Sequence, residues 1–144
     1  MSDDVFLDTN ILVYATAKGD PRAATAIRLL SAGGVVSVQV LNEFTSVARH
    51  KLKWSWPEVI RALAEFRILL RAPQPITLAT HEMALEIAQQ DGLGVYDALI
   101  VASALEAGCT MLLSEDMQDG RVIDGRLRIC NPFNVAPTGV DERP

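Results

Sequence analysis

The chain has 144 residues, of which 49% are hydrophobic, and its 13 basic and 18 acidic residues give a net charge of −5. This length suits one domain with a sizeable core, and the acidic balance argues against a general nucleic-acid binder that relies on a basic surface. Apolar stretches stop well short of the about 18 to 20 residues of a membrane-spanning helix, and the acidic first residues differ from the basic start of a signal peptide, so we expect a cytoplasmic protein without a membrane partner.

The first third of the chain alternates short apolar runs with helical patterns. Residues 5–7 predict a buried strand, and residues 11–17 could add a first helical turn or two. Asp20-Pro21 has the N-cap and first-turn residues of a helix that continues to about residue 30 and is stopped by a glycine pair. Residues 35–38 then predict a second strand.

The middle of the chain predicts three helices. Apolar residues recur every 3.6 positions over about residues 39–48. A capping box of Ser and Glu opens an amphipathic stripe over residues 55–70. Two prolines then break the chain, Ile76 can supply a very short strand, and a further helix ends at Gly92.

The last third predicts a buried helix between strands. Residues 95–107 are apolar nearly all round, which is typical of a buried helix. Strands are expected at residues 109–113 and 127–130, and strands that alternate with helices indicate a mostly parallel sheet covered on both faces. We expect one domain over residues 1–133 and a loose tail over residues 134–144, where proline and charged residues gather.

Four acidic residues stand where strands end or helices begin, each beside an apolar run: Asp8, Glu43, Asp97 and Asp116. Each alone has a structural explanation as a cap, a helix-dipole contact or a turn acceptor. The four acids taken together are less well explained in this way, because a parallel sheet brings the carboxyl ends of its strands to one edge, where ligands bind. Gathered carboxylates need a cation, and Mg²⁺ suits them because it takes an oxygen shell that includes waters and substrate phosphate.

A carboxylate metal site fits phosphodiester hydrolysis, because the ion lowers the pKa of a bound water and polarises the phosphoryl oxygen. Neither a Ser/His/Asp nor a Cys/His assembly is indicated, and a Gly-rich phosphate loop is absent from the sequence. Basic residues cluster over residues 49–53, 61–71 and 121–128. They could follow a phosphate backbone, or they could be solvated helix faces and ends.

Four segments resemble, in order, those of a known family: residues 6–15, 42–44, 96–104 and 112–117. On these segments the chain resembles PIN-domain ribonucleases, and more closely the VapC-type toxins of bacterial toxin–antitoxin pairs. The resemblance implies a three-layer α/β/α sandwich with a mostly parallel central sheet and endonucleolytic cleavage of RNA. It also implies frequent homodimers and inhibition by a cognate antitoxin protein.

The resemblance also assigns site residues. The metal-site acids of the family, which would hold Mg²⁺ or Mn²⁺, map onto Asp8, Glu43, Asp97 and Asp116. Its polar residues that position water or orient carboxylates map onto Asn10 and Ser114. Asp119 could be a further metal ligand, or it could belong to the turn that Asp119-Gly120 readily forms.

Two other functions stay open at this point. A haloacid-dehalogenase-like phosphatase would carry a second Asp two residues after the first, where this chain has Asn10. A non-catalytic PIN scaffold would bind RNA or a partner without cutting, and it would not need all four acids.

Overall fold

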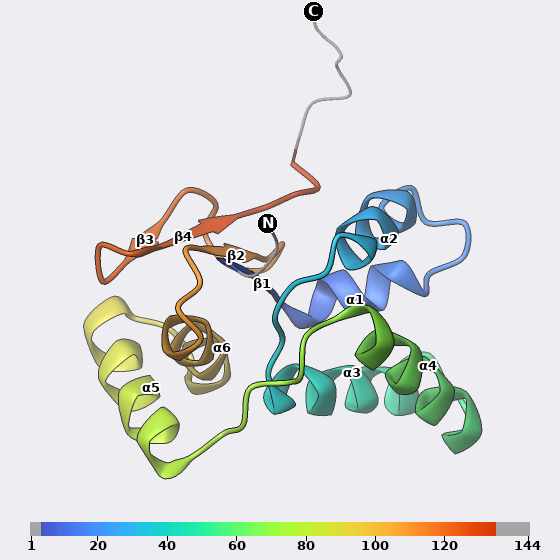
Figure 1. Cartoon of the computed structure of the whole chain (residues 1–144), viewed down its shortest axis with the longest axis horizontal. Helices are drawn as coiled ribbons and strands as arrows, with labels where there is room; N and C mark the ends of the chain where they lie inside the picture. The colour runs from blue at the N-terminus through green and yellow to red at the C-terminus, as the bar shows by residue number, and fades with distance from the viewer. Residues whose placement is uncertain (1–3, 135–144) are drawn as a thin grey trace, which may run out of the picture.

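The computed structural model describes residues 4–134. Its helices and strands, in chain order, are β1 (Val5–Leu7), α1 (Thr9–Ala15), α2 (Ala23–Ser31), α3 (Val38–His50), α4 (Trp56–Leu69), α5 (Leu78–Asp91), α6 (Val95–Glu106), β2 (Met111–Leu113), β3 (Val122–Ile123) and β4 (Leu127–Cys130) (Figure 1). The expected tail over residues 134–144 lies, apart from residue 134, outside the described residues. No helix within residues 4–134 is long and apolar enough to span a bilayer.

The sheet has the order β1-β2-β4-β3 and is mostly parallel, as expected. β1 pairs in parallel with β2, and β2 pairs in parallel with β4. One register row joins Phe6, Leu112 and Ile129, and all three side chains are fully buried. This row anchors the strands in the core, which fixes where the chain leaves β1 and β2.

The antiparallel strand β3 was not predicted. It forms a hairpin with β4 through Asp124 and Gly125, whose φ angles are 55° and 63°. Two successive positive φ angles are typical of the tight hairpin turn that Asp-Gly favours. The Asp-Gly pair was therefore a readable signal, although a strand of two residues gives almost no pattern of its own.

The prediction of a strand at residues 35–38 was wrong in extent. Val35 forms an isolated parallel bridge with Phe6, in which its N–H donates to the Val5 carbonyl oxygen and its own carbonyl oxygen accepts from Leu7 N, both at 2.9 Å. Ser37 already caps α3, because its side chain accepts from Val40 N, and the helix begins at the next residue. Extended backbone therefore lasts too briefly to form a ladder.

The very short strand expected at Ile76 is instead a single bridge at Gln74, which pairs with Ser37. Gln74 N donates to the Val36 carbonyl oxygen at 2.8 Å. Proline on each side of Gln74 lacks the N–H that a longer ladder requires. The bridge therefore remains one residue long.

Helix α2 begins later than Asp20-Pro21 predicted. Asp20 Oδ1 accepts from Arg22 N at 2.8 Å, and the Ala23 N–H donates to the Asp20 carbonyl oxygen at 3.0 Å. Asp20 thus closes a turn with its own side chain, as Asp commonly does. The helix starts at Ala23, with Arg22 as its N-cap.

The other helix signals are confirmed. Ser55 and Glu58 form the reciprocal capping box of α4. Helix α5 ends at Gly92, which adopts the left-handed conformation with φ of 70°. All residues from Ala98 to Leu105 of α6 are buried, in agreement with the apolar pattern.

The helices form two groups around the sheet. Figure 1 shows α5 and α6 below one end of the sheet and α1 to α4 gathered at the other, and α5 packs along α6 while α1 contacts α2 and α3. Phe44 of α3 lies edge-on to Phe66 of α4, with ring centroids 5.0 Å apart. The arrangement confirms the expected α/β class, and it directs β1, α1, α3, α6 and the loop after β2 toward one region.

Candidate functional site

The four predicted acids come from four parts of the fold. Asp8 follows β1 and caps α1, Glu43 lies in α3, and Asp97 lies in the first turn of α6. Asp116 lies in the loop after β2. Asp8 N donates to the carbonyl oxygen of Leu113 at 3.0 Å, so the ends of β1 and β2 are joined directly.

The side chain of Asp8 is held by its neighbours. Its Oδ1 accepts from Thr9 N at 2.7 Å, and its Oδ2 accepts from Ser114 Oγ at 2.7 Å. Asn10 Nδ2 lies 3.5 Å from Asp8 Oδ2 and donates to Asp116 Oδ2 at 3.2 Å. The structure therefore brings Asn10 and Ser114 to the acids whose orientation they were predicted to fix, and their role in catalysis stays a prediction.

Glu43 is oriented by two residues that the sequence pattern did not single out. Thr9 Oγ1 donates to Glu43 Oε1 at 2.7 Å, and Gln39 Nε2 donates to Glu43 Oε2 at 3.0 Å. Gln39 was findable, because a polar residue four positions before an acid in a helix lies on the same face. Thr9 stands between two predicted site residues, but its link to α3 depends on the fold.

The acids share one electrostatic environment. Asp8 is only 4% exposed, and burial, opposed by the hydrogen bonds from Ser114 and Thr9 and assisted by the charges of Glu43 and Asp116, raises its pKa to about 6. The pKa of Asp97 is also raised, first by burial and then by the charges of Asp116 and Glu43. The charges of Glu43 and Asp116 thus make Asp8 and Asp97 harder to ionise, which is the condition that a bound cation relieves.

The donor set fits a hard divalent cation, because it offers carboxylate oxygens alone. Within residues 4–134, the side chains as they stand place no three Asp, Glu, His or Cys groups around a single ion position. Mg²⁺ is commonly held by one or two carboxylates, with waters and substrate phosphate completing its shell. A cation held by these carboxylates would therefore need waters or substrate oxygens to complete its shell.

Asp119 lies apart from this cluster. Its Oδ1 accepts from Asn131 N at 2.9 Å, and its side chain is exposed. Its charge is not among those that raise the pKa of Asp8 or Asp97. Asp119 and Gly120 lie in a turn in which Arg121 N donates to the Gln118 carbonyl oxygen at 3.3 Å, which supports the turn explanation. Metal binding by Asp119 stays a prediction.

A second hydrogen-bond network, formed by Arg22, Tyr14 and Glu115, stabilises the loop that carries Asp116. Arg22 Nη1 donates to Tyr14 Oη at 2.7 Å and to Glu115 Oε2 at 3.1 Å, and Tyr14 Oη donates to Glu115 Oε1. Burial and then the hydrogen bond to Glu115 raise the pKa of Tyr14 to about 12, so its hydroxyl keeps its proton. Glu115 N also donates to Asn10 Oδ1 at 3.3 Å, so Glu115 is fixed by side chain and backbone next to Asp116.

A cleft of about 480 Å³ opens beside the acids. It begins at Asn10, Glu43 and Asp116 and extends along α3 to Lys51 and Leu52. The volume lies within the range of small-ligand sites. The candidate site therefore has a hollow that leads away from the carboxylates.

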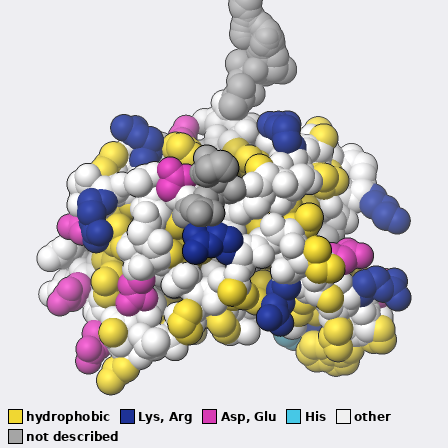
Figure 2. All heavy atoms as spheres, viewed as in Figure 1, with side chains coloured by type: hydrophobic (Ala, Val, Ile, Leu, Met, Phe, Trp, Pro, Cys, Tyr) yellow, Lys and Arg dark blue, Asp and Glu magenta, His cyan; other side chains and the backbone are white. Residues whose placement is uncertain are grey.

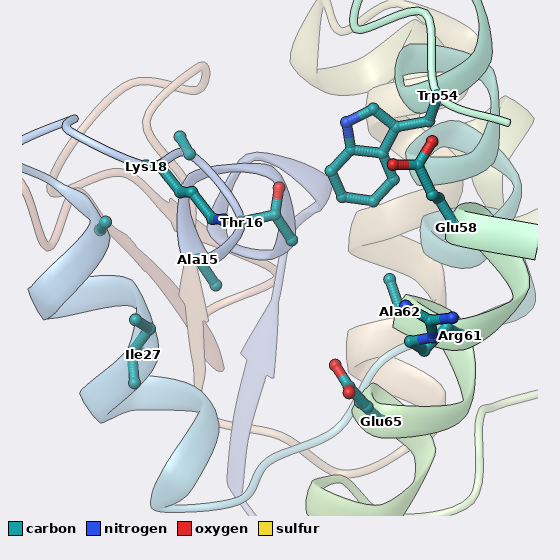
Figure 3. A pocket seen from close by; sticks show the side chains of 11 residues that line it. Ala15, Thr16, Lys18, Ile27, Trp54, Glu58, Arg61, Ala62 and Glu65 are labelled. Atoms are coloured by element: carbon teal, nitrogen blue, oxygen red, sulfur yellow. The ribbon is translucent and has the colours of Figure 1, made fainter.

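A larger cavity of about 850 Å³ lies elsewhere, and none of the predicted acids lines it. Figure 3 shows Lys18 and Ile27 on one side of it and Trp54, Arg61 and Glu65 on the other. Its charged side chains are of both signs, since Lys18 and Arg61 line it together with Glu58 and Glu65. Size alone does not mark this cavity as the chemical site.

Comparison with known proteins gives the same fold. The model of the PIN domain family matches residues 5–120. Among solved structures, the chain is similar to the sarcin-ricin loop cleaving toxin VapC20 of Mycobacterium tuberculosis, with 23% identity over 78% of this chain and 91% of that chain and a TM-score of 0.62. It is also similar to VapBC2 from Rickettsia felis bound to a DNA fragment from its promoter (23% identity, 88% of this chain, 97% of that chain, TM-score 0.64).

A toxin–antitoxin complex from Klebsiella pneumoniae is similar over 91% of this chain and 99% of that chain, with 20% identity and a TM-score of 0.68. No curated protein sequence matches the chain. At these identities the solved structures establish a shared fold. The family match covers every predicted acid.

Proposed function

Because this chain belongs to the PIN domain family, we propose that it is a metal-dependent endoribonuclease that acts as the toxin of a type II toxin–antitoxin pair. The PIN family is a family of nucleases that generally depend on divalent metals. The observation that carries the proposal is the shared electrostatic environment of Asp8, Glu43, Asp97 and Asp116. All four acids lie within the segment that matches the family.

Each site residue has a separate task in this proposal. Mg²⁺ or Mn²⁺ would be held by the four acids Asp8, Glu43, Asp97 and Asp116. Asp119 could add a further ligand. When bound, the ion would neutralise these carboxylates and supply an activated water for attack on the phosphodiester. Ser114 and Thr9 fix Asp8 in one orientation, and Asn10 ties Asp116 to the same place.

Asp97 is our candidate for the carboxylate that takes a proton from the attacking water, because both oxygens of Asp8, whose pKa is also raised, already accept hydrogen bonds from Thr9 and Ser114. Asp97 is half-buried, and its pKa is raised toward the working pH. A general base works best when its pKa lies near the pH of the reaction. Glu43 is less suited, because both of its oxygens already accept hydrogen bonds from Thr9 and Gln39.

The partners follow from the proteins that share the fold. VapC20 is described as a toxin that cleaves the sarcin-ricin loop, and two of the similar structures are VapBC or toxin–antitoxin complexes. We propose an RNA substrate, a cognate antitoxin protein and a homodimer for this chain. Residues 1–133 would form the nuclease domain, and the protein would act in the cytoplasm.

A cleavage assay with matched variants tests the activity. The wild-type protein should cleave RNA when Mg²⁺ is present and stop when EDTA removes it, and Asp97→Asn should abolish cleavage. Asp124→Asn is the control, because Asp124 pairs with Arg126 at an exposed hairpin outside the site. RNA that stays whole with wild-type protein while being bound would favour the non-catalytic scaffold, and rapid turnover of small phosphomonoesters would favour the phosphatase.

Expression in a bacterial host tests the toxin role separately. Growth should stop on expression of the wild-type chain, continue with Asp97→Asn, and recover when a short gene directly upstream is expressed with it. Wild-type growth despite RNA cleavage in vitro would argue against the toxin role and leave the nuclease intact.

A further inference from the structure

The cleft beside the acids has two chemically different ends. Glu43 and Asp116 line the end where the cation would lie. Lys51, the residue that follows α3, lines the other end. A substrate that spans the cleft therefore meets carboxylates at one end and an ammonium group at the other.

Lys51 is available to a ligand. It is the one Lys or Arg among the described residues that line the cleft, and its side chain is exposed. The ion pairs formed within residues 4–134 do not include it. Figure 2 shows Lys and Arg side chains next to hydrophobic ones over the region where α3 ends and α4 begins.

The wall between the two ends is mostly apolar. Val13 and Val47 line it together with Tyr14 and Ser46. Leu52 stands at the Lys51 end and is 41% exposed. A large exposed apolar side chain next to a cation suits a ligand that has both a flat apolar face and a negative charge. A nucleotide has this combination in its base and its phosphate.

We propose that this cleft binds one nucleotide of single-stranded RNA next to the cleaved bond, with its phosphate on Lys51 and its base against Val47 and Leu52. This inference rests on the proposed nuclease function, and it adds a residue that holds the substrate without taking part in the chemistry. A volume of about 480 Å³ suits a ligand of this size. Lys51 thereby places the neighbouring phosphodiester at the carboxylates.

The test compares Lys51→Gln with Lys53→Gln. Both residues are exposed lysines two positions apart and both changes remove one positive charge, but Lys53 is not among the residues that line the cleft. Binding of a fluorescent single-stranded RNA is measured by anisotropy over a range of salt concentrations. The protein used is Asp97→Asn, so that binding is measured without cleavage.

Lys51→Gln should weaken binding about fivefold at 0.1 M salt and lower the salt slope by about 0.7, the value for one lost phosphate contact on a single strand. Lys53→Gln should leave the slope nearly unchanged. Leu52→Ala should weaken binding without changing the slope, whereas Leu78→Ala, on an equally apolar exposed residue of α5, should have no effect.

Equal effects of the two lysine variants, an unchanged slope for Lys51→Gln, or undetectable RNA binding by the parent protein would overturn the proposal. A separate cleavage assay with the wild-type protein shows which idea has failed. Selective loss of binding in Lys51→Gln together with absent cleavage would retain the nucleotide site and reject the nuclease. Cleavage by the wild-type protein together with equal effects of Lys51→Gln and Lys53→Gln would retain the nuclease and reject the nucleotide site.

Discussion

Replacement of Asp8 by Asn should stabilise the metal-free protein at neutral pH, although Asp8 belongs to the proposed metal site. The pKa of this buried carboxyl is about 6 in the folded chain against an ordinary 3.8, and that difference corresponds to about 3 kcal/mol. Asn removes the buried charge but cannot accept both hydrogen bonds, from Thr9 and Ser114, equally well, which costs about 1 kcal/mol. The expected net gain is therefore about 2 kcal/mol in the free energy of unfolding.

The sign of the pH dependence follows from proton binding. Because the folded-state pKa is raised, the folded chain holds more protons than the unfolded chain between about pH 4 and pH 6, and stability from this group falls as the pH rises through that window. The advantage of Asp8→Asn should appear above pH 6 and vanish below pH 4.

Urea unfolding in EDTA at pH 7 and at pH 4 measures both effects. Asp124→Asn is the control, because it removes a carboxylate from an exposed hairpin outside the candidate site. A variant that is less stable than wild type at pH 7, or a difference that does not change with pH, would refute the reasoning. Added Mg²⁺ should stabilise wild type and should stabilise Asp8→Asn much less.

Two further outcomes test the Arg22–Tyr14–Glu115 network and the core. Arg22→Gln removes the cation that neutralises Glu115 beside Asp116, so kcat should fall several-fold with little change in KM. Glu115→Gln keeps a partner for Tyr14 and should lose less activity. Equal changes in kcat and KM for Arg22→Gln would contradict a positioning role. Phe44→Ala should lower the free energy of unfolding by about 3 to 5 kcal/mol in chemical denaturation, because Phe44 is fully buried against Phe66; a loss below about 1 kcal/mol would contradict that packing.

Local signals were enough to predict most helices. The capping box of Ser55 and Glu58 acts within four residues, and the all-round apolar pattern of α6 needs only its own segment. Strand extent was harder to predict, because it depends on pairing. Residues 35–38 have strand composition, yet Ser37 caps a helix, and only two isolated bridges remain, at Val35 and at Ser37.

The candidate site could likewise be predicted only in part. Asp8 and Asp116 could be found because each follows a strand, and a parallel sheet brings such positions together. Asp97 lies in the first turn of α6, as expected, whereas Glu43 lies in the middle of α3 and not at its start.

The family resemblance supplied Asn10 and Ser114, and helical spacing could have supplied Gln39. Thr9 could not be found, because it reaches Glu43 over 34 positions of the chain. Arg22 and Glu115 are 93 positions apart, and each reads as an ordinary surface charge until the fold pairs them.

The central claim is that Asp8, Glu43, Asp97 and Asp116 together bind a divalent cation. A crystal of the protein soaked in Mn²⁺, with anomalous diffraction collected at the manganese edge, tests it most directly. We predict a strong peak about 2.0 to 2.2 Å from oxygens of at least two of these carboxylates, within the distances usual for hard divalent ions, and its loss in Asp97→Asn. A site without a peak at saturating Mn²⁺, or a peak held by other residues, would contradict the account.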